Sequence, residues 1–141
     1  MPRIKLTPPT TVHFSTKLSI RITDLNYGGH LGNDRLLALL HEARAQFFKH
    51  FGYTEMNLGE SIGIIMSDAA IEYKSEGFGG DELEIKMTAQ EFTPKGFDLF
   101  YQVKNLTQQK TLALAKTGIV CFDYSKRKIA LVPEGFRGNF E

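Results

Sequence analysis

Residues 21–51 read RITDLNYGGHLGNDRLLALLHEARAQFFKHF, which joins the end of a strand to a polar turn and then to a long apolar segment. Apolar residues recur at helical spacing in that segment, at Leu36, Leu40, Ala43 and Phe47. The spacing predicts a helix of about 18 residues that begins at Asn33, a residue able to cap it, and stops at Gly52. An apolar stripe this broad needs a cover larger than one neighbouring helix.

The rest of the chain supplies that cover as strands. Alternating apolar and polar residues predict strands at 12–22, 62–74, 83–89 and 97–103, with further runs at 111–124 and 129–132. In the first of these we expect Val12, Phe14, Leu18, Ile20 and Ile22 to face one way. Because the later strands follow one another through short turns, they predict an α+β protein with a curved antiparallel sheet wrapped round the helix.

Domain organisation is equally simple, since no internal repeat or linker is present. We expect a single domain over residues 1–141, with residues 1–10 as an extended arm and residues 134–141 as a tail. The run 111–124 is apolar on both faces, which is typical of a central strand and implies additional burial, for example from a partner subunit.

Composition excludes several functional classes. The chain has 141 residues, 42% of them hydrophobic and 23% charged, which indicates a folded domain. A net charge of +1 gives no electrostatic case for nucleic acid or an acidic membrane surface. The single cysteine, Cys121, excludes an internal disulfide, and with four histidines it argues against a closed zinc site. We expect no membrane span and a cytoplasmic location.

Two short motifs carry a resemblance to a known family. Residues 24–33 read DLNYGGHLGN and residues 41–44 read HEAR. They resemble the hotdog-fold acyl thioesterases, a group that includes 4-hydroxybenzoyl-CoA and acyl-carrier-protein thioesterases, whose usual pattern is D-x-D-x-x-x-H-V-N-N followed by E-x-A-R. The resemblance implies a hotdog fold of five to six antiparallel strands round one long central helix. It also implies hydrolysis of an acyl thioester of coenzyme A or acyl carrier protein, with no cofactor, in a homodimer or homotetramer with sites at the subunit interface.

The chain departs from the motif at two positions. Asn26 stands where many members have their catalytic aspartate, and Gly32 stands where the first asparagine of the run is usual. A mechanism that uses a carboxylate at the first of these positions therefore does not carry over. Plant-type members use an asparagine and a histidine from this loop, but their asparagine aligns with Gly28.

Thioester hydrolysis needs a polarised carbonyl and an activated water. Backbone N–H groups at the start of the helix can polarise the oxygen, and we expect these donors among Gly28, Gly29, Leu31, Gly32 and Asn33. We assign Glu42 as the base, because a carboxylate on an apolar helix loses hydration and its pKa rises. His30 and Asn26 are assigned to positioning and polarisation, Asp24 to holding the loop, and Asp68 is the reserve base.

Each assignment has a structural alternative. Glu42 can lie on a solvated helix face and pair with Gln46 or Lys49, Asp24 can form an Asx turn, and Asp68 can be ion-paired. The basic run 126–128 is best interpreted as a solvated turn, and contact with coenzyme A phosphates is a weaker interpretation.

Two other functions compete with hydrolysis. A hotdog-fold enoyl or hydroxyacyl thioester hydratase-dehydratase would pair His30 with Glu42, but the G-H-F-P run of those enzymes is absent after His30. A non-catalytic acyl-thioester binding protein is favoured only by the missing motif aspartate at Asn26.

Overall fold

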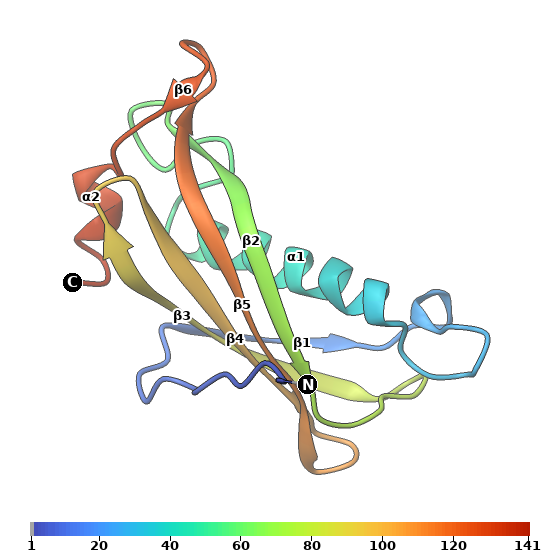
Figure 1. Cartoon of the computed structure of the whole chain (residues 1–141). Coiled ribbons are helices and arrows are strands. Elements are labelled where there is room, and N and C mark those ends of the chain that lie inside the picture. The colour runs from blue at the N-terminus through green and yellow to red at the C-terminus, as the bar shows by residue number, and fades with distance from the viewer. Residues whose placement is uncertain (1) are drawn as a thin grey trace.

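The computed structural model describes residues 2–141, which fold into one sheet and two α-helices (Figure 1). Its elements are β1 (Phe14–Ser19), the short 3₁₀ helix η1 (Ile22–Asp24), α1 (Asn33–His50), β2 (Gly63–Tyr73), β3 (Glu82–Thr93), β4 (Gly96–Asn105), β5 (Lys110–Asp123), β6 (Lys128–Ile129) and α2 (Glu134–Arg137).

The strands form one antiparallel sheet in the order β1-β3-β4-β5-β2, with β6 paired to the end of β5. Strands β3, β4 and β5 are successive hairpin partners, whereas β2 lies beside β5 at the far edge of the sheet. Helix α1 runs along one face of the curved sheet (Figure 1). The predicted antiparallel sheet with one long helix is therefore confirmed, and β1 and β2 are its two edge strands.

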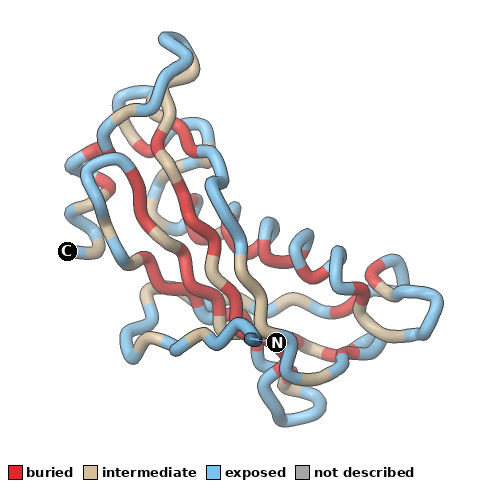
Figure 2. Tube along the Cα trace, viewed as in Figure 1, coloured by how far each residue is buried: buried red, intermediate tan, exposed pale blue. Residues whose placement is uncertain are grey.

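The core lies between α1 and the sheet, as the band of buried residues in Figure 2 shows. One face of α1 is buried and shares the hydrophobic core with side chains of β3, β4 and β5. Ile20 belongs to this core, but Ile22 is 83% exposed. The expected alternation fails at Ile22 because β1 ends at Ser19 and the chain turns into η1.

Helix α1 contains the predicted 18 residues and begins at Asn33. Its N-cap is Gly32, and no side chain caps it, because Asn33 Oδ1 accepts the N–H of Asp34 instead (3.0 Å). The helix ends at His50, and Gly52 follows with a φ of +89°, a conformation that glycine adopts without strain.

The N-terminal segment crosses the face of the sheet that is opposite to α1 (Figure 1). Thr88 Oγ1 donates to Thr11 O (2.6 Å) at β3, and the Leu6 N–H donates to Glu72 Oε1 (3.0 Å) at β2. Pro8 lines a cavity together with Leu114, which is buried on this outer face of β5. Part of the extra cover expected from a partner subunit thus comes from the chain's own N-terminal segment.

Residues 134–141 are not the tail that was expected. They form α2 and a last turn, and Phe136 is fully buried against Phe48 and Phe97. Phe140 stacks on Phe47 with ring centroids 5.6 Å apart. The two phenylalanines close the end of the core, which is why this segment is ordered.

None of the helices in residues 2–141 has both the length and the apolar character needed to cross a bilayer.

Candidate functional site

A cavity of about 260 Å³ lies at the N-terminal end of α1, and we name it the helix-end cavity. It is bounded by the polar loop that precedes α1, by the end of β2 with the residues that follow it, and by one residue of β5. Its lining residues are Asn26, His30, Leu31, Gly32, Asn33, Leu36, Tyr73, Ser75, Glu76, Gly77 and Leu112. The loop singled out in the sequence therefore forms one wall of a cavity whose other wall comes from residues 40 or more positions later.

Asn26 organises the loop from within. Its Oδ1 accepts the N–H of Gly28 (2.9 Å) and, more weakly, the N–H of His30 (3.4 Å). Because Oδ1 faces these two donors, the other end of the amide is Nδ2, which carries two N–H groups. No acceptor for Nδ2 occurs within residues 2–141. Asn26 thus presents a hydrogen-bond donor at the wall of the cavity.

Gly77 lets the two walls approach each other. The Leu31 N–H donates to Gly77 O (2.8 Å), and His30 and Phe78 form a further β-bridge with their rings edge to face at 6.3 Å. A Cβ at Gly77 would lie 2.5 Å from Ile20 Cδ1, so any other residue would force the buried Ile20 side chain to move. The loop around His30 is therefore fixed to the segment after β2.

Most of the expected oxyanion donors are already engaged. The N–H groups of Gly28, Gly29, Leu31 and Gly32 donate to Asn26 Oδ1, Asn26 O, Gly77 O and Asp24 O, respectively. The N–H of Asn33, the first helical residue, has no acceptor in the described part of the chain, as expected at the first turn of a helix. Of the five expected backbone donors, only the Asn33 N–H is therefore free in the described residues, and the Asn26 side chain is a further donor at the cavity.

Asp24 holds the loop and does not line the cavity. It is 2% exposed, and its Oδ2 accepts the N–H of Arg21 (2.8 Å) and, at 3.4 Å, the Arg21 Nε. Its carbonyl oxygen accepts the Gly32 N–H (3.0 Å). Asp24 therefore links η1 to Gly32, the residue that precedes α1.

Six of the eleven lining residues were not predicted as site residues, and three of these six have polar side chains: Tyr73, Ser75 and Glu76. The Tyr73 hydroxyl donates to Asn33 O (3.1 Å), and burial raises the pKa of this phenol, with a smaller contribution from Asp34. Glu76 is exposed and is the only carboxylate of the lining. Strand alternation indicates which way Tyr73 points, but nothing in the sequence places it beside Asn33.

Glu42 lies outside the helix-end cavity of its own chain. It is exposed on α1, where its Oε2 accepts the Gln46 Nε2–H (2.8 Å). The desolvation on which its assignment as base depended is thus absent in a single chain. The observed geometry is the pairing with Gln46 that was the structural alternative.

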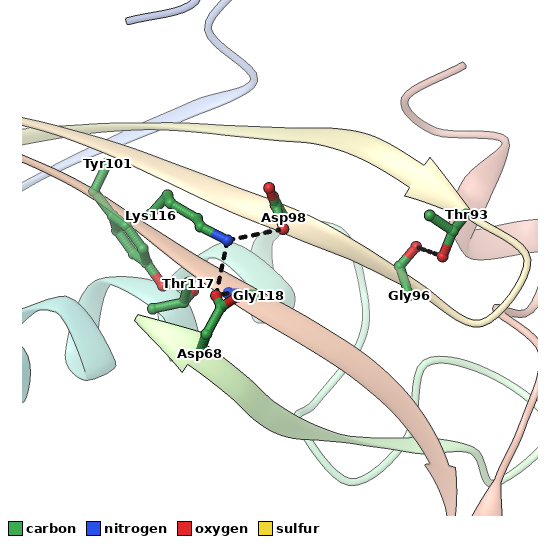
Figure 3. A network of polar contacts seen from close by, with 8 residues as sticks. All are labelled: Asp68, Thr93, Gly96, Asp98, Tyr101, Lys116, Thr117 and Gly118. Carbon is green, nitrogen blue, oxygen red and sulfur yellow. Dashed lines mark hydrogen bonds and ion pairs between the residues drawn. The ribbon is translucent and has the colours of Figure 1, made fainter. Parts of the chain in front are cut away.

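Asp68 also lies away from the helix-end cavity, in a cluster of charges on the outer face of the sheet (Figure 3). Lys116 Nζ contacts Asp68 Oδ1 at 2.8 Å and Asp98 Oδ1 at 3.7 Å, and the Gly118 N–H donates to Asp68 Oδ1 (2.9 Å). The hydrogen bond from Lys116 holds the pKa of Asp68 below its ordinary value. A lowered pKa makes a carboxylate a weaker base, so Asp68 is better explained as the ion-paired strand residue.

Within residues 2–141, no group of three or more His, Cys, Asp or Glu residues is arranged to hold a metal ion. The ionisable groups of the helix-end cavity are His30, Tyr73 and Glu76.

Comparisons with known proteins agree with this architecture. Residues 20–140 match the family model of the thioesterase-like superfamily. A 1,4-dihydroxy-2-naphthoyl-CoA thioesterase from Synechocystis is similar in structure with a TM-score of 0.80 and 20% identity, over 89% of this chain and 93% of that chain. A gentisyl-coenzyme A thioesterase has a TM-score of 0.79 and 17% identity, over 91% and 100% of the two chains.

A thioesterase-superfamily protein from Jannaschia has a TM-score of 0.82 and 18% identity, over 94% of this chain and 83% of that chain. These structures confirm the hotdog fold. A search of curated proteins found no match.

Proposed function

Because this chain belongs to the thioesterase-like superfamily, we propose that it hydrolyses acyl thioesters at the helix-end cavity. A thioester of coenzyme A is the favoured substrate and one of acyl carrier protein is the second candidate. Two structurally similar proteins are thioesterases of 1,4-dihydroxy-2-naphthoyl-CoA and gentisyl-CoA, which supports the coenzyme A form.

The observation that carries the proposal is the pair of unused donors at one cavity. The Asn33 N–H and the Asn26 Nδ2 group both belong to the wall of the helix-end cavity, at the positive end of the α1 dipole. Donors placed where negative charge develops stabilise the tetrahedral intermediate of acyl transfer. In this mechanism water adds to the carbonyl carbon, the oxygen becomes an anion held by these donors, and the C–S bond then breaks to release the thiol.

The water needs a base that takes its proton. His30 and Glu76 lie at the cavity and are the candidates within one chain. Glu42 remains a candidate only if a second copy of the chain brings its exposed carboxylate to this cavity. These three residues, rather than Asp68, are therefore the set to test.

The free edge of the sheet at β2 also favours association with a second copy of the chain. Strand β2 pairs with β5 on one side only, over 11 residues, and Ile65, Met66 and Tyr73 on it are substantially exposed. A long apolar edge strand of this kind pairs readily with another chain. We propose a homodimer in which β2 is covered by the partner and the helix-end cavity, next to Tyr73, is completed there.

The test uses a panel of acyl-CoA substrates with a thiol-trapping dye, and enoyl-CoA followed by absorbance. We expect thiol release, and a loss of at least ~100-fold in kcat when the base is removed. The variants are His30→Ala, Glu42→Gln and Glu76→Gln, with Glu134→Gln in α2 as the matched exposed control.

Each alternative has its own result. Hydration of enoyl-CoA without thiol release would replace the proposal with the hydratase-dehydratase function. Ligand binding without turnover for every acyl chain would leave a non-catalytic binding protein. If none of the three variants loses activity, the assignment of the base to this set is wrong.

A further inference from the structure

A second cavity, of about 420 Å³, lies on the outer face of the sheet, beneath the N-terminal segment. Pro8 contributes one side, and strands β3, β4 and β5 contribute the floor. The lining residues are Pro8, Lys74, Lys86, Gln102, Val103, Lys104, Thr111 and Leu114, and we name this the lysine cavity. None of its residues belongs to the helix-end cavity.

The lysine cavity is positively charged. Its lining contains three lysines and no acidic residue. Lys74 is paired with Glu72 at 2.8 Å, but Lys86 and Lys104 have no carboxylate within 4.0 Å in residues 2–141. Unpaired ammonium groups inside a concave site favour an anionic ligand, and phosphate is the anion that lysine commonly binds.

The remaining lining suits an aromatic base attached to such phosphates. Pro8 offers apolar surface above the buried Leu114, and the Gln102 side chain offers both a donor and an acceptor. Leu114 is only 8% exposed, although it lies on the face of the sheet opposite to α1, beneath the N-terminal segment. A phosphorylated nucleoside matches this combination of apolar surface, amide and cations.

The two cavities lie on opposite faces of the same end of the sheet. Tyr73 lines the helix-end cavity and Lys74, the next residue, lines the lysine cavity. On β5 the same relation holds for Leu112 and Thr111. Successive residues of a strand point to opposite faces and have Cα atoms about 3.8 Å apart. The route between the cavities therefore passes round the end of β2 and β5.

We propose that the lysine cavity binds the 3′-phosphorylated ADP end of coenzyme A, while the pantetheine arm passes round residues 73–75 and delivers the thioester to the helix-end cavity. This inference rests on the proposed function and adds the carrier to it. A pantetheine arm is about as long as five extended residues, or ~17 Å, which is sufficient to cross the end of one sheet. Lys86 and Lys104 would contact the phosphates.

The basic turn at 126–128 is a poorer site for these phosphates. It borders a cavity of about 960 Å³ with Lys95 and Arg137, but three acidic residues, Glu60, Asp123 and Glu134, line the same cavity. That cavity lies at the opposite end of β5. Eleven residues separate Leu112 from Asp123, which is about 36 Å of strand and beyond the reach of one pantetheine arm.

Calorimetric titration of the whole protein with free coenzyme A, dephospho-coenzyme A and pantetheine tests the inference without any requirement for turnover. The variant is Lys86→Ala/Lys104→Ala, and the control is Lys126→Ala/Lys128→Ala, which removes the same charge. We expect the variant to weaken coenzyme A binding about tenfold or more, to weaken dephospho-coenzyme A binding less, and to leave pantetheine binding unchanged. The control should bind all three as the wild type does.

Three results would overturn the inference: no binding of coenzyme A to the wild type, unchanged binding to the variant, or an equal loss in the control. Hydrolysis of acyl-pantetheine by a protein that fails this test would leave the proposed function intact. Conversely, if coenzyme A binding depends on these lysines but no acyl-CoA is hydrolysed, the nucleotide site would be supported and the proposed thioesterase activity would be contradicted. All four substituted lysines are exposed, so the variants should fold, and a thermal melt checks this.

Discussion

Asn26 organises the loop before α1 through its amide oxygen and also carries N–H donors. The amide oxygen of Asn26 accepts the N–H groups of Gly28 and His30. A carboxylate would accept the same two bonds, but only an amide also offers N–H donors. With Asn26 at this position, the loop has a donor beside the Asn33 N–H and no carboxylate there to take a proton.

Asn26→Asp separates these two roles. The variant keeps the oxygen that organises the loop and removes the donor, so we expect normal folding and a loss of about 100-fold in kcat. Asn57→Asp is the matched control, since Asn57 Oδ1 accepts the N–H groups of Gly59 and Ser61 in the same way, outside the cavity. Steady-state kinetics with an acyl-CoA measures the effect. Turnover at or above that of the wild type would contradict the donor role.

Cys121 is expected to be inert in the folded protein. Its side chain is fully buried in the core, and burial raises the pKa of the thiol to about 11. At pH 8 the thiolate fraction is therefore on the order of 0.1%, and the dye cannot reach it. We expect no reaction with a thiol-trapping dye in the native state and one equivalent after unfolding. Rapid labelling of the native protein would show that this part of the core opens.

We expect Asp98 to make the free energy of unfolding depend on pH. Partial burial raises the pKa of its carboxyl in the folded state, an effect larger than the opposing one from Lys116. Because the folded pKa of Asp98 is raised, the folded state binds the proton more tightly than the unfolded state does. Proton binding by Asp98 therefore stabilises the fold below the unfolded pKa, and this stabilisation is lost as the pH rises through the folded pKa. Urea denaturation of wild type and Asp98→Asn should therefore show the variant gaining stability relative to the wild type as the pH rises from 3 to 7. A constant difference across this range would contradict the assignment.

At the scale of elements, helices and strands that depend on neighbouring residues could be predicted from the sequence. Contacts between residues far apart in the chain could not. The position and length of helix α1 were predicted because its apolar stripe and Gly52 are local signals, although its N-cap is Gly32 and not the expected Asn33. Strand positions were right to within a few residues for the same reason. The site was predicted only in part, because Tyr73 meets Asn33 through the pairing of β2 with β5, and register between strands is not a local signal.

Helix α2 was not predicted from the sequence, and neither was the short η1. Helix α2 has four residues, too few to show a helical period, and it is ordered through the aromatic packing of Phe136 and Phe140. We expect Phe136→Ala to lower the free energy of unfolding by about 3–5 kcal/mol, because it empties a fully buried position. Leu131→Ala, at an exposed position nearby, should change it by less than ~0.5 kcal/mol. Urea denaturation compares the two, and equal effects would mean that α2 is not part of the core.

At the scale of the whole molecule, the two faces of the sheet are closed in different ways. One face is covered by α1, and the other is crossed by the N-terminal segment, which reaches from Thr88 on β3 to Glu72 on β2. The sheet has two edge strands, β1 and β2, and β2 is the longer, with 11 residues against 6. Strand β2 pairs only with β5. Both cavities lie at the end of this strand, so an assembly that covers β2 also determines the surroundings of the proposed substrate site.

Ile65→Lys tests that assembly. Ile65 lies on β2 and is 37% exposed in one chain, and a lysine on an edge strand opposes pairing with another strand. Ile129→Lys is the control. Ile129 is 50% exposed on β6, which pairs with β5 and not with β2. By light scattering coupled to size exclusion we expect the wild type and the control at twice the 15.9 kDa of one chain or more, and Ile65→Lys at the mass of a monomer.

If the helix-end cavity is completed by the partner, acyl-CoA hydrolysis should fall together with the mass and recover at protein concentrations that restore the dimer. A monomeric wild type with full activity would show that one chain contains the whole site, and Glu42 would then have no route to the substrate.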